Sequence, residues 1–64
     1  MTLKLERVKR NLTQKELRKI SGVSVLTIGK IEKGEKDTVK LGIYKKLAKA
    51  LDITIEELIK EQEV

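Results

Sequence analysis

At 64 residues, with fifteen Lys or Arg against ten Asp or Glu, the chain is short and basic, with a net charge of +5. A chain of this length buries only about 60% of its unfolded surface, which leaves little room for an active-site cavity. It contains neither Cys nor His, which are common nucleophiles, general bases and zinc ligands, so we expect no enzymatic activity and no cofactor or metal.

No apolar run approaches the roughly 20 residues needed to span a bilayer. The first ten residues also lack the apolar stretch of a signal peptide. We therefore expect a cytoplasmic protein with no membrane partner. The sequence has no proline, no low-complexity tract and no internal repeat, so it predicts a single domain over residues 1–64, with fraying near residues 61–64.

The positive charge is concentrated in the first part of the chain. Residues 1–36 hold ten Lys or Arg and four Glu, a net charge of +6, whereas residues 37–64 have a net charge of −1. A basic half is typical of nucleic-acid binders, because Lys and Arg displace the cations condensed around phosphates. A lysine-rich surface that is only solvated has the same composition, so charge alone leaves both interpretations open.

The first predicted helix covers residues 3–10. Leu5, Val8 and Leu12 recur there at helical spacing. Asn11 tolerates the left-handed conformation that ends many helices, and it follows this segment directly.

The second predicted helix, over residues 14–21, has both a start and a stop signal. Thr13 and Glu16 have the spacing of a capping box, in which each side chain bonds the backbone N–H of the other residue. Gly22 can adopt the positive φ that ends the helix.

The third predicted helix covers residues 25–33, between the N-cap Ser24 and the terminator Gly34. Its β-branched residues could instead alternate in a strand, but Leu26 breaks the polarity alternation and the flanking caps favour a helix. The link between the two helices is only three or four residues long, so their axes cross sharply. Residues 13–34 therefore predict a helix-turn-helix.

Two further helices complete the predicted fold. Residues 40–51 form a helix with one core-facing stripe, made of Leu41, Tyr44, Leu47, Ala48 and Leu51. A fifth helix follows Thr54, which forms a second capping box with Glu57. The sequence thus predicts an all-α, compact five-helix bundle.

One set of residues resembles a known family over nearly the whole chain. The set comprises Thr13, Gln14, Leu17, Gly22, Val23, Ser24, Ile28, Ile31, Glu32 and Gly34. It is similar to the lambda repressor-like, Cro/C1-type (XRE family) helix-turn-helix DNA-binding domain. The resemblance implies that the third helix enters the major groove of double-stranded DNA, usually in a symmetric homodimer.

The resemblance also implies a set of DNA-binding positions, namely Thr13, Gln14, Ser24, Val25, Leu26, Thr27, Lys30, Lys33 and Lys36. In the family, the residue at position 14 contacts a phosphate and supports the first recognition residue, while positions 25, 26, 27 and 30 face base edges. Lys33 and Lys36, and with them Arg10, are expected at the phosphate backbone. Ile28 and Ile31 are expected in the core.

The recognition face departs from the polar pattern common in the family. Val25 and Leu26 cannot form hydrogen bonds with bases, although apolar side chains can pack on thymine methyl groups. Lys30 can donate to guanine or to phosphate. We therefore expect few hydrogen bonds to bases and a larger contribution from DNA shape. A protein contact through Val25 and Leu26 is the alternative.

Three further positions bear on the structure rather than on base recognition. Arg7 and Glu32 match a pair that forms an interhelical salt bridge in relatives, which would keep the carboxylate from repelling phosphate. Arg18 replaces a usual alanine at the helix crossing, and we expect its stem to pack while its guanidinium reaches solvent.

These observations predict a sequence-specific, DNA-binding transcriptional regulator. We expect a repressor that acts as a homodimer on a palindromic operator, is associated with the nucleoid and needs no small-molecule ligand. The exposed apolar residues of the last segment, Ile55, Ile59 and Val64, are candidates for the dimer surface. A DNA-binding antitoxin, a restriction-system controller and a protein-interaction module remain alternatives.

Overall fold

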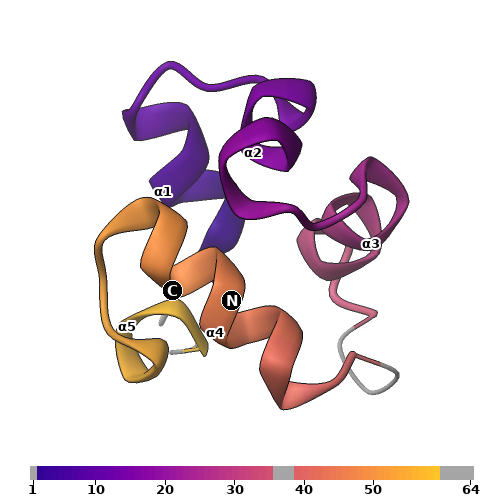
Figure 1. The fold of residues 1–64 in the computed structure, drawn as a ribbon, viewed down its shortest axis with the longest axis vertical. Coiled ribbons are helices and arrows are strands. Elements are labelled where there is room, and N and C mark those ends of the chain that lie inside the picture. The colour runs from indigo at the N-terminus through magenta and orange to yellow at the C-terminus, as the bar shows by residue number, and fades with distance from the viewer. Residues whose placement is uncertain (1, 36–38, 60–64) are drawn as a thin grey trace.

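The computed structural model describes residues 2–35 and 39–59, and within these ranges the chain forms five helices and no strand (Figure 1). The helices are α1 (Leu3–Lys9), α2 (Gln14–Ser21), α3 (Val25–Glu32), α4 (Leu41–Leu51) and α5 (Ile55–Ile59). The predicted all-α class is confirmed. The bounds of α2 agree with the prediction, and those of α1, α3 and α4 differ from it by one residue at one end.

Side-chain caps fix where the helices begin. The Thr13 hydroxyl accepts from the Glu16 N–H at 3.0 Å, and the Thr13 N–H donates to the Glu16 carboxylate at 2.9 Å, which completes the predicted capping box. The Ser24 hydroxyl accepts from the backbone N–H three residues later at 3.2 Å. The Thr54 hydroxyl makes the corresponding contact at the start of α5, at 3.1 Å.

Residues in the left-handed conformation fix where most of the helices end. Asn11 follows α1 with φ 56°, and Gly22 ends α2 with φ 77°. Gly34, with φ 90°, turns the chain after α3. Asp52 ends α4 with φ 57°, a terminator that sequence analysis did not single out. The turn at Gly22 is the one that directs α3 away from α2.

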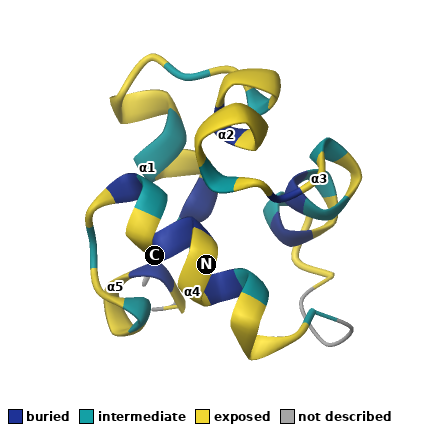
Figure 2. Cartoon of the chain, in the orientation of Figure 1, coloured by how far each residue is buried: buried dark blue, intermediate teal, exposed yellow. Residues whose placement is uncertain are grey.

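The core lies where the helices meet around α4 (Figure 2). α2 packs against α3 and α4, α5 packs against α4, and α1 packs against α3. The buried residues are Leu3, Leu17, Val23, Ile28, Ile31, Tyr44, Leu47, Ala48, Leu51 and Leu58. The expected burial of Ile28 and Ile31 is confirmed, so the opposite side of α3 is left for solvent or a partner.

The predicted core-facing stripe of α4 is wrong at its first residue. Leu41, the first residue of the helix, is 58% exposed, because the stripe reaches the core only from Tyr44 onward. In α1, the core contact comes from Leu3, whereas Leu5 and Val8 are about half exposed. Helical spacing identified both helices correctly, and in α4 four of the five predicted stripe residues are buried.

The first turn of α1 is attached to α5. The Thr2 N–H donates to the Leu58 carbonyl oxygen at 3.2 Å, and the Thr2 hydroxyl lies 2.9 Å from the Glu57 carbonyl oxygen. This contact holds Leu3 over the core from the side of α5. Within the described ranges, no helix has the length and apolar character required to cross a membrane.

Candidate nucleic-acid interface

α3 presents its outer side at the edge of the bundle, where no other helix covers it (Figure 1). Its inner stripe, Ile28 and Ile31, is fully buried. Its outer side carries Leu26 and Lys30, which are exposed, and Lys33 follows in the C-cap position. The helix is thus fixed by an apolar inner side and free for contacts on the other.

An open groove of about 530 Å³ runs along this outer side. Its lining residues come from α1, α2, α3 and the segment after α3, namely Lys4, Gln14, Val25, Leu26, Gly29, Lys30, Glu32, Lys33 and Glu35. Five of the predicted DNA-binding residues therefore lie together along one surface. Lys36 lies outside the described residues.

Thr13, Ser24 and Thr27 are not among the groove residues and have structural contacts instead. Thr13 caps α2 and Ser24 caps α3. The Ser24 hydroxyl also donates to the Thr27 hydroxyl oxygen at 3.0 Å. These bonds orient the first turns of the two helices, whose free backbone N–H groups attract anions.

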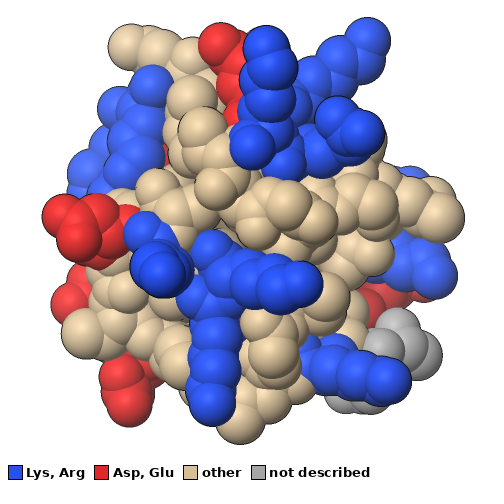
Figure 3. Space-filling model, viewed as in Figure 1, with Lys and Arg blue, Asp and Glu red and all other residues tan. Residues whose placement is uncertain are grey.

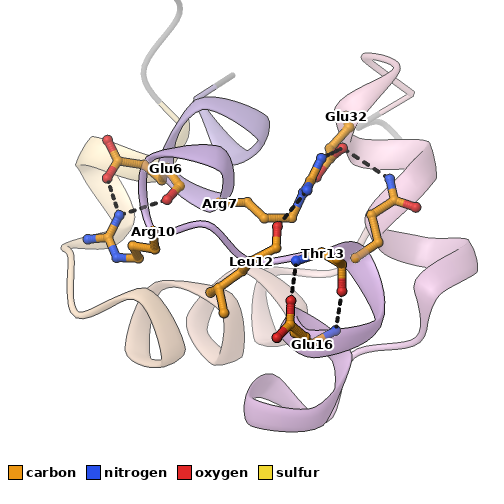
Figure 4. Close-up of polar contacts among 8 residues, drawn as sticks. Glu6, Arg7, Arg10, Leu12, Thr13, Glu16 and Glu32 are labelled. Atoms are coloured by element: carbon orange, nitrogen blue, oxygen red, sulfur yellow. Dashed lines mark hydrogen bonds and ion pairs between the residues drawn. The ribbon is translucent and has the colours of Figure 1, made fainter.

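The salt bridge implied by the resemblance is present and ties α1 to α3 (Figure 4). Arg7 Nε donates to Glu32 Oε2 at 2.7 Å and Arg7 Nη2 donates to Glu32 Oε1 at 3.1 Å, a two-point contact. Arg7 Nη1 donates to the Leu12 carbonyl oxygen at 2.7 Å. The two side chains are only 12% and 7% exposed, and the bond to Glu32 raises the pKa of Arg7 above its ordinary value.

Glu32 also holds the side chain of Gln14. Gln14 Nε2 donates to Glu32 Oε1 at 3.0 Å. An ionised carboxylate only accepts hydrogen bonds, so the amide nitrogen of Gln14 must face Glu32 and its oxygen must face away. Glu32 therefore joins α1, α2 and α3 through Arg7 and Gln14, and Arg7 neutralises its charge.

Three groove residues, Lys4, Gly29 and Glu35, were missed by sequence analysis. Lys4 lies on α1, and only the packing of α1 on α3 brings it beside the groove. Gly29 lies on the outer side of α3, and a Cβ atom built there meets nothing within 4 Å. A glycine inside a predicted helix, three residues after Leu26, was a signal that could have indicated a close approach by a partner.

Arg10 and Arg18 differ in their surroundings. Arg10 is exposed, but its guanidinium donates to the Glu6 carboxylate and to the Leu51 carbonyl oxygen, each at 2.7 Å. Its expected place at the phosphate backbone stays a prediction, and these bonds show that the guanidinium also has contacts within the fold. Arg18 is exposed and lines a second open groove of about 430 Å³, together with Lys15, Glu16, Lys19 and Val25.

The basic surface extends beyond the helix-turn-helix. Lys and Arg side chains lie over α2 and around α4 on the face shown in Figure 3. Lys45, Lys46 and Lys49 of α4 are all exposed. Counting charge along the chain assigned the positive character to the first 36 residues, whereas in the fold α4 contributes to it as well.

The comparison with protein families agrees with this geometry. The helix-turn-helix family HTH_3 matches residues 3–58, from the first residue of α1 to the penultimate residue of α5. Comparisons with curated proteins and with solved structures gave no match. A domain of this family binds DNA and is typically non-catalytic. The chain belongs to the Cro/C1-type (XRE) helix-turn-helix family.

Proposed function

We propose that the protein is a sequence-specific transcriptional repressor that binds a palindromic operator as a homodimer, with α3 in the major groove. The observation that carries this proposal is the groove along α3, where Lys4, Lys30 and Lys33 surround the exposed outer side of a fixed helix. A major groove about 12 Å wide admits one α-helix, and lysines at its borders meet the two phosphate backbones.

The proposed contacts fall into two groups. Leu26 and Lys30 face base edges, with Val25 and Thr27 beside them at the start of α3. Gln14, Lys33 and the first turns after Thr13 and Ser24 position the protein on the phosphates. Glu32, which lies in the same groove, is compatible with this role because Arg7 neutralises it.

Dimerisation is proposed from the symmetry of operators bound by this domain class. Two copies of α3 would enter successive major grooves about 34 Å apart. Of the expected dimer residues, Ile59 is 44% exposed, Ile55 is half-buried against the core, and Val64 lies outside the described residues. Ile59 is therefore the apolar contact that we assign to the second copy.

Selection of duplexes from a random library tests the proposal directly. We expect a palindromic site whose half-sites are about 10 base pairs apart, bound far more tightly than random duplex. Lys30→Ala should weaken binding to this site about tenfold, because one contact of this kind contributes on the order of 1–3 kcal/mol.

Lys49→Ala is the matched control, since this exposed lysine of α4 lines neither groove, and it should retain the affinity. Equal, weak binding to every duplex, unchanged by Lys30→Ala, would contradict the proposal. That result would favour the alternative of a protein-interaction module, for which the 72% exposure of Leu26 is the supporting observation.

A further inference from the structure

Leu26 is the most exposed large hydrophobic residue of the described chain, at 72%. An exposed leucine on its own is ordinary. This one, however, lies in the groove along α3, beside the half-buried Val25 and one helical turn before Gly29 and Lys30. Leu26 is therefore an exposed apolar side chain on the side of α3 that is proposed to face DNA.

Gly29 gives the surface next to Leu26 its shape. A Cβ atom at this position meets nothing within 4 Å, so no neighbouring side chain requires a glycine there. Glycine inside a helix costs about 1 kcal/mol relative to alanine. Its effect on the surface is a notch beside Leu26, in which a ligand can approach the backbone of α3 closely.

The charges beside this notch favour a polyanion. Lys4, Lys30 and Lys33 line the same groove. Glu32 is held by Arg7, so of the two acids in the groove, Glu35 carries the exposed negative charge. An apolar contact flanked by lysines matches the edge of a base pair between two phosphate backbones.

On the major-groove edges of the four bases, the one methyl group is the C5-methyl group of thymine. A hydrogen-bonding group of a base placed against Leu26 would lose water without gaining a hydrogen bond, which costs free energy. Val25 is less suited to this contact, because it is half-buried between the two grooves.

We infer that Leu26, beside the notch at Gly29, recognises thymine through its C5-methyl group. One position of each half-site is thus read by hydrophobic contact rather than by a hydrogen bond. This inference rests on the proposed function, since it requires that α3 lie in the major groove. The inference attributes the base preference at that position to the Leu26 side chain and to the absence of a side chain at Gly29.

Deoxyuridine in place of thymidine tests the inference, because it removes the methyl group and leaves the base pair intact. Each thymine of the selected half-site is replaced in turn. At the position that contacts Leu26, we expect affinity to fall about fourfold, the effect of burying one methyl-sized group. The replacement at other positions should have a smaller effect.

Leu26→Ala should bind the thymidine and deoxyuridine duplexes equally, which isolates the contact as a double-mutant cycle. Leu41→Ala removes another exposed leucine, outside both grooves, and should keep the fourfold difference. Because both side chains are exposed, thermal unfolding of the two variants should match that of the parent protein.

A failure of the proposed function can be distinguished from a failure of the inference about Leu26. If no duplex is preferred in the selection, the proposed function fails and the inference fails with it. If a preferred duplex lacks thymine, shows no loss with deoxyuridine, or shows a loss that persists in Leu26→Ala, the inference about Leu26 is overturned while the regulator stands.

Discussion

Glu32 is the residue on which the contacts between α1, α2 and α3 converge. It accepts two hydrogen bonds from Arg7 and one from Gln14, and its side chain is only 7% exposed. Removing one member of such a pair leaves the other charge poorly solvated. The stability of the interface thus depends on a residue that need not touch DNA.

Glu32→Ala should lower the free energy of unfolding by about 3 kcal/mol, because Arg7 then remains largely buried without its carboxylate. Urea denaturation measures the change. Glu35→Ala removes an exposed glutamate in the segment that follows the same helix and should change stability by less than about 0.5 kcal/mol. Equal effects of the two substitutions would refute a structural role for the ion pair.

A second glutamate connects stability to pH. The Thr13 N–H, followed by the Thr13 hydroxyl, holds the pKa of the Glu16 carboxyl below its ordinary value of 4.5. A carboxyl whose pKa is lower in the folded state stabilises the fold above its unfolded-state pKa, and this contribution disappears as the pH falls through the folded-state value. The N-cap of α2 is therefore sensitive to acid.

Glu16→Gln should make stability fall less steeply when the pH is lowered from about 6 to about 3, because the neutral amide cannot lose a charge there. Urea midpoints at several pH values measure the slope. A second acid-sensitive pair remains in the variant, since Arg10 lowers the pKa of Glu6, so some slope should persist. Parallel pH profiles for variant and parent would count against the Thr13 contact as its source.

At the scale of the helices, the sequence predicted a helix end correctly where residues next to that end determine it. α2 was predicted correctly because a capping box and a left-handed glycine, both adjacent in sequence, define its two ends. The predicted start of α4 was one residue early, since Lys40 is an extended N-cap residue without a capping hydrogen bond, and the exposure of Leu41 depends on how far the neighbouring helices extend. The groove residue Lys4 could not be found, because its position depends on the packing of α1 on α3.

Gly22 is favoured by the fold itself, whereas Gly29 is favoured only by the proposed contact with DNA. Gly22→Ala should destabilise the protein by about 1 kcal/mol, because its φ of 77° disfavours any side chain. Gly29→Ala should stabilise it by a similar amount, since α3 is helical there and the space is open. Urea denaturation of both variants should show these opposite shifts.

Gly29→Ala should nevertheless weaken binding to the preferred duplex about tenfold, because a methyl group in a close contact costs on the order of 1–2 kcal/mol. Gly42→Ala, an open helical position of α4 outside both grooves, should stabilise the fold and leave the affinity unchanged. An affinity for Gly29→Ala equal to that of the parent would show that DNA does not approach α3 at this position.

At the scale of the whole molecule, charge determines how DNA binding responds to salt. The chain has a net charge of +5; Lys and Arg side chains lie over α2 and around α4 (Figure 3), and three lysines line the groove along α3. Only lysines that touch phosphates release counterions on binding. The salt dependence of affinity therefore separates the lysines of the interface from those that only carry charge.

Lys33→Ala should reduce the slope of log K against log salt by about 1, the value for one lost phosphate contact. Lys45→Ala, on α4, should lower affinity slightly at low salt and leave the slope unchanged. Fluorescence anisotropy over a salt series measures both slopes. Identical slopes for parent and Lys33→Ala would remove Lys33 from the proposed interface.

The bonds from Thr2 to the last turn of α5 join residues 55 and 56 positions apart in sequence. On a ribosome, α5 is synthesised after α1 to α4, so Thr2 has no acceptor for these bonds until Glu57 and Leu58 have been translated. Leu3, the residue after Thr2, is fully buried in the complete fold. The contact between Thr2 and α5 can therefore form only after all five helices of the described fold have been synthesised.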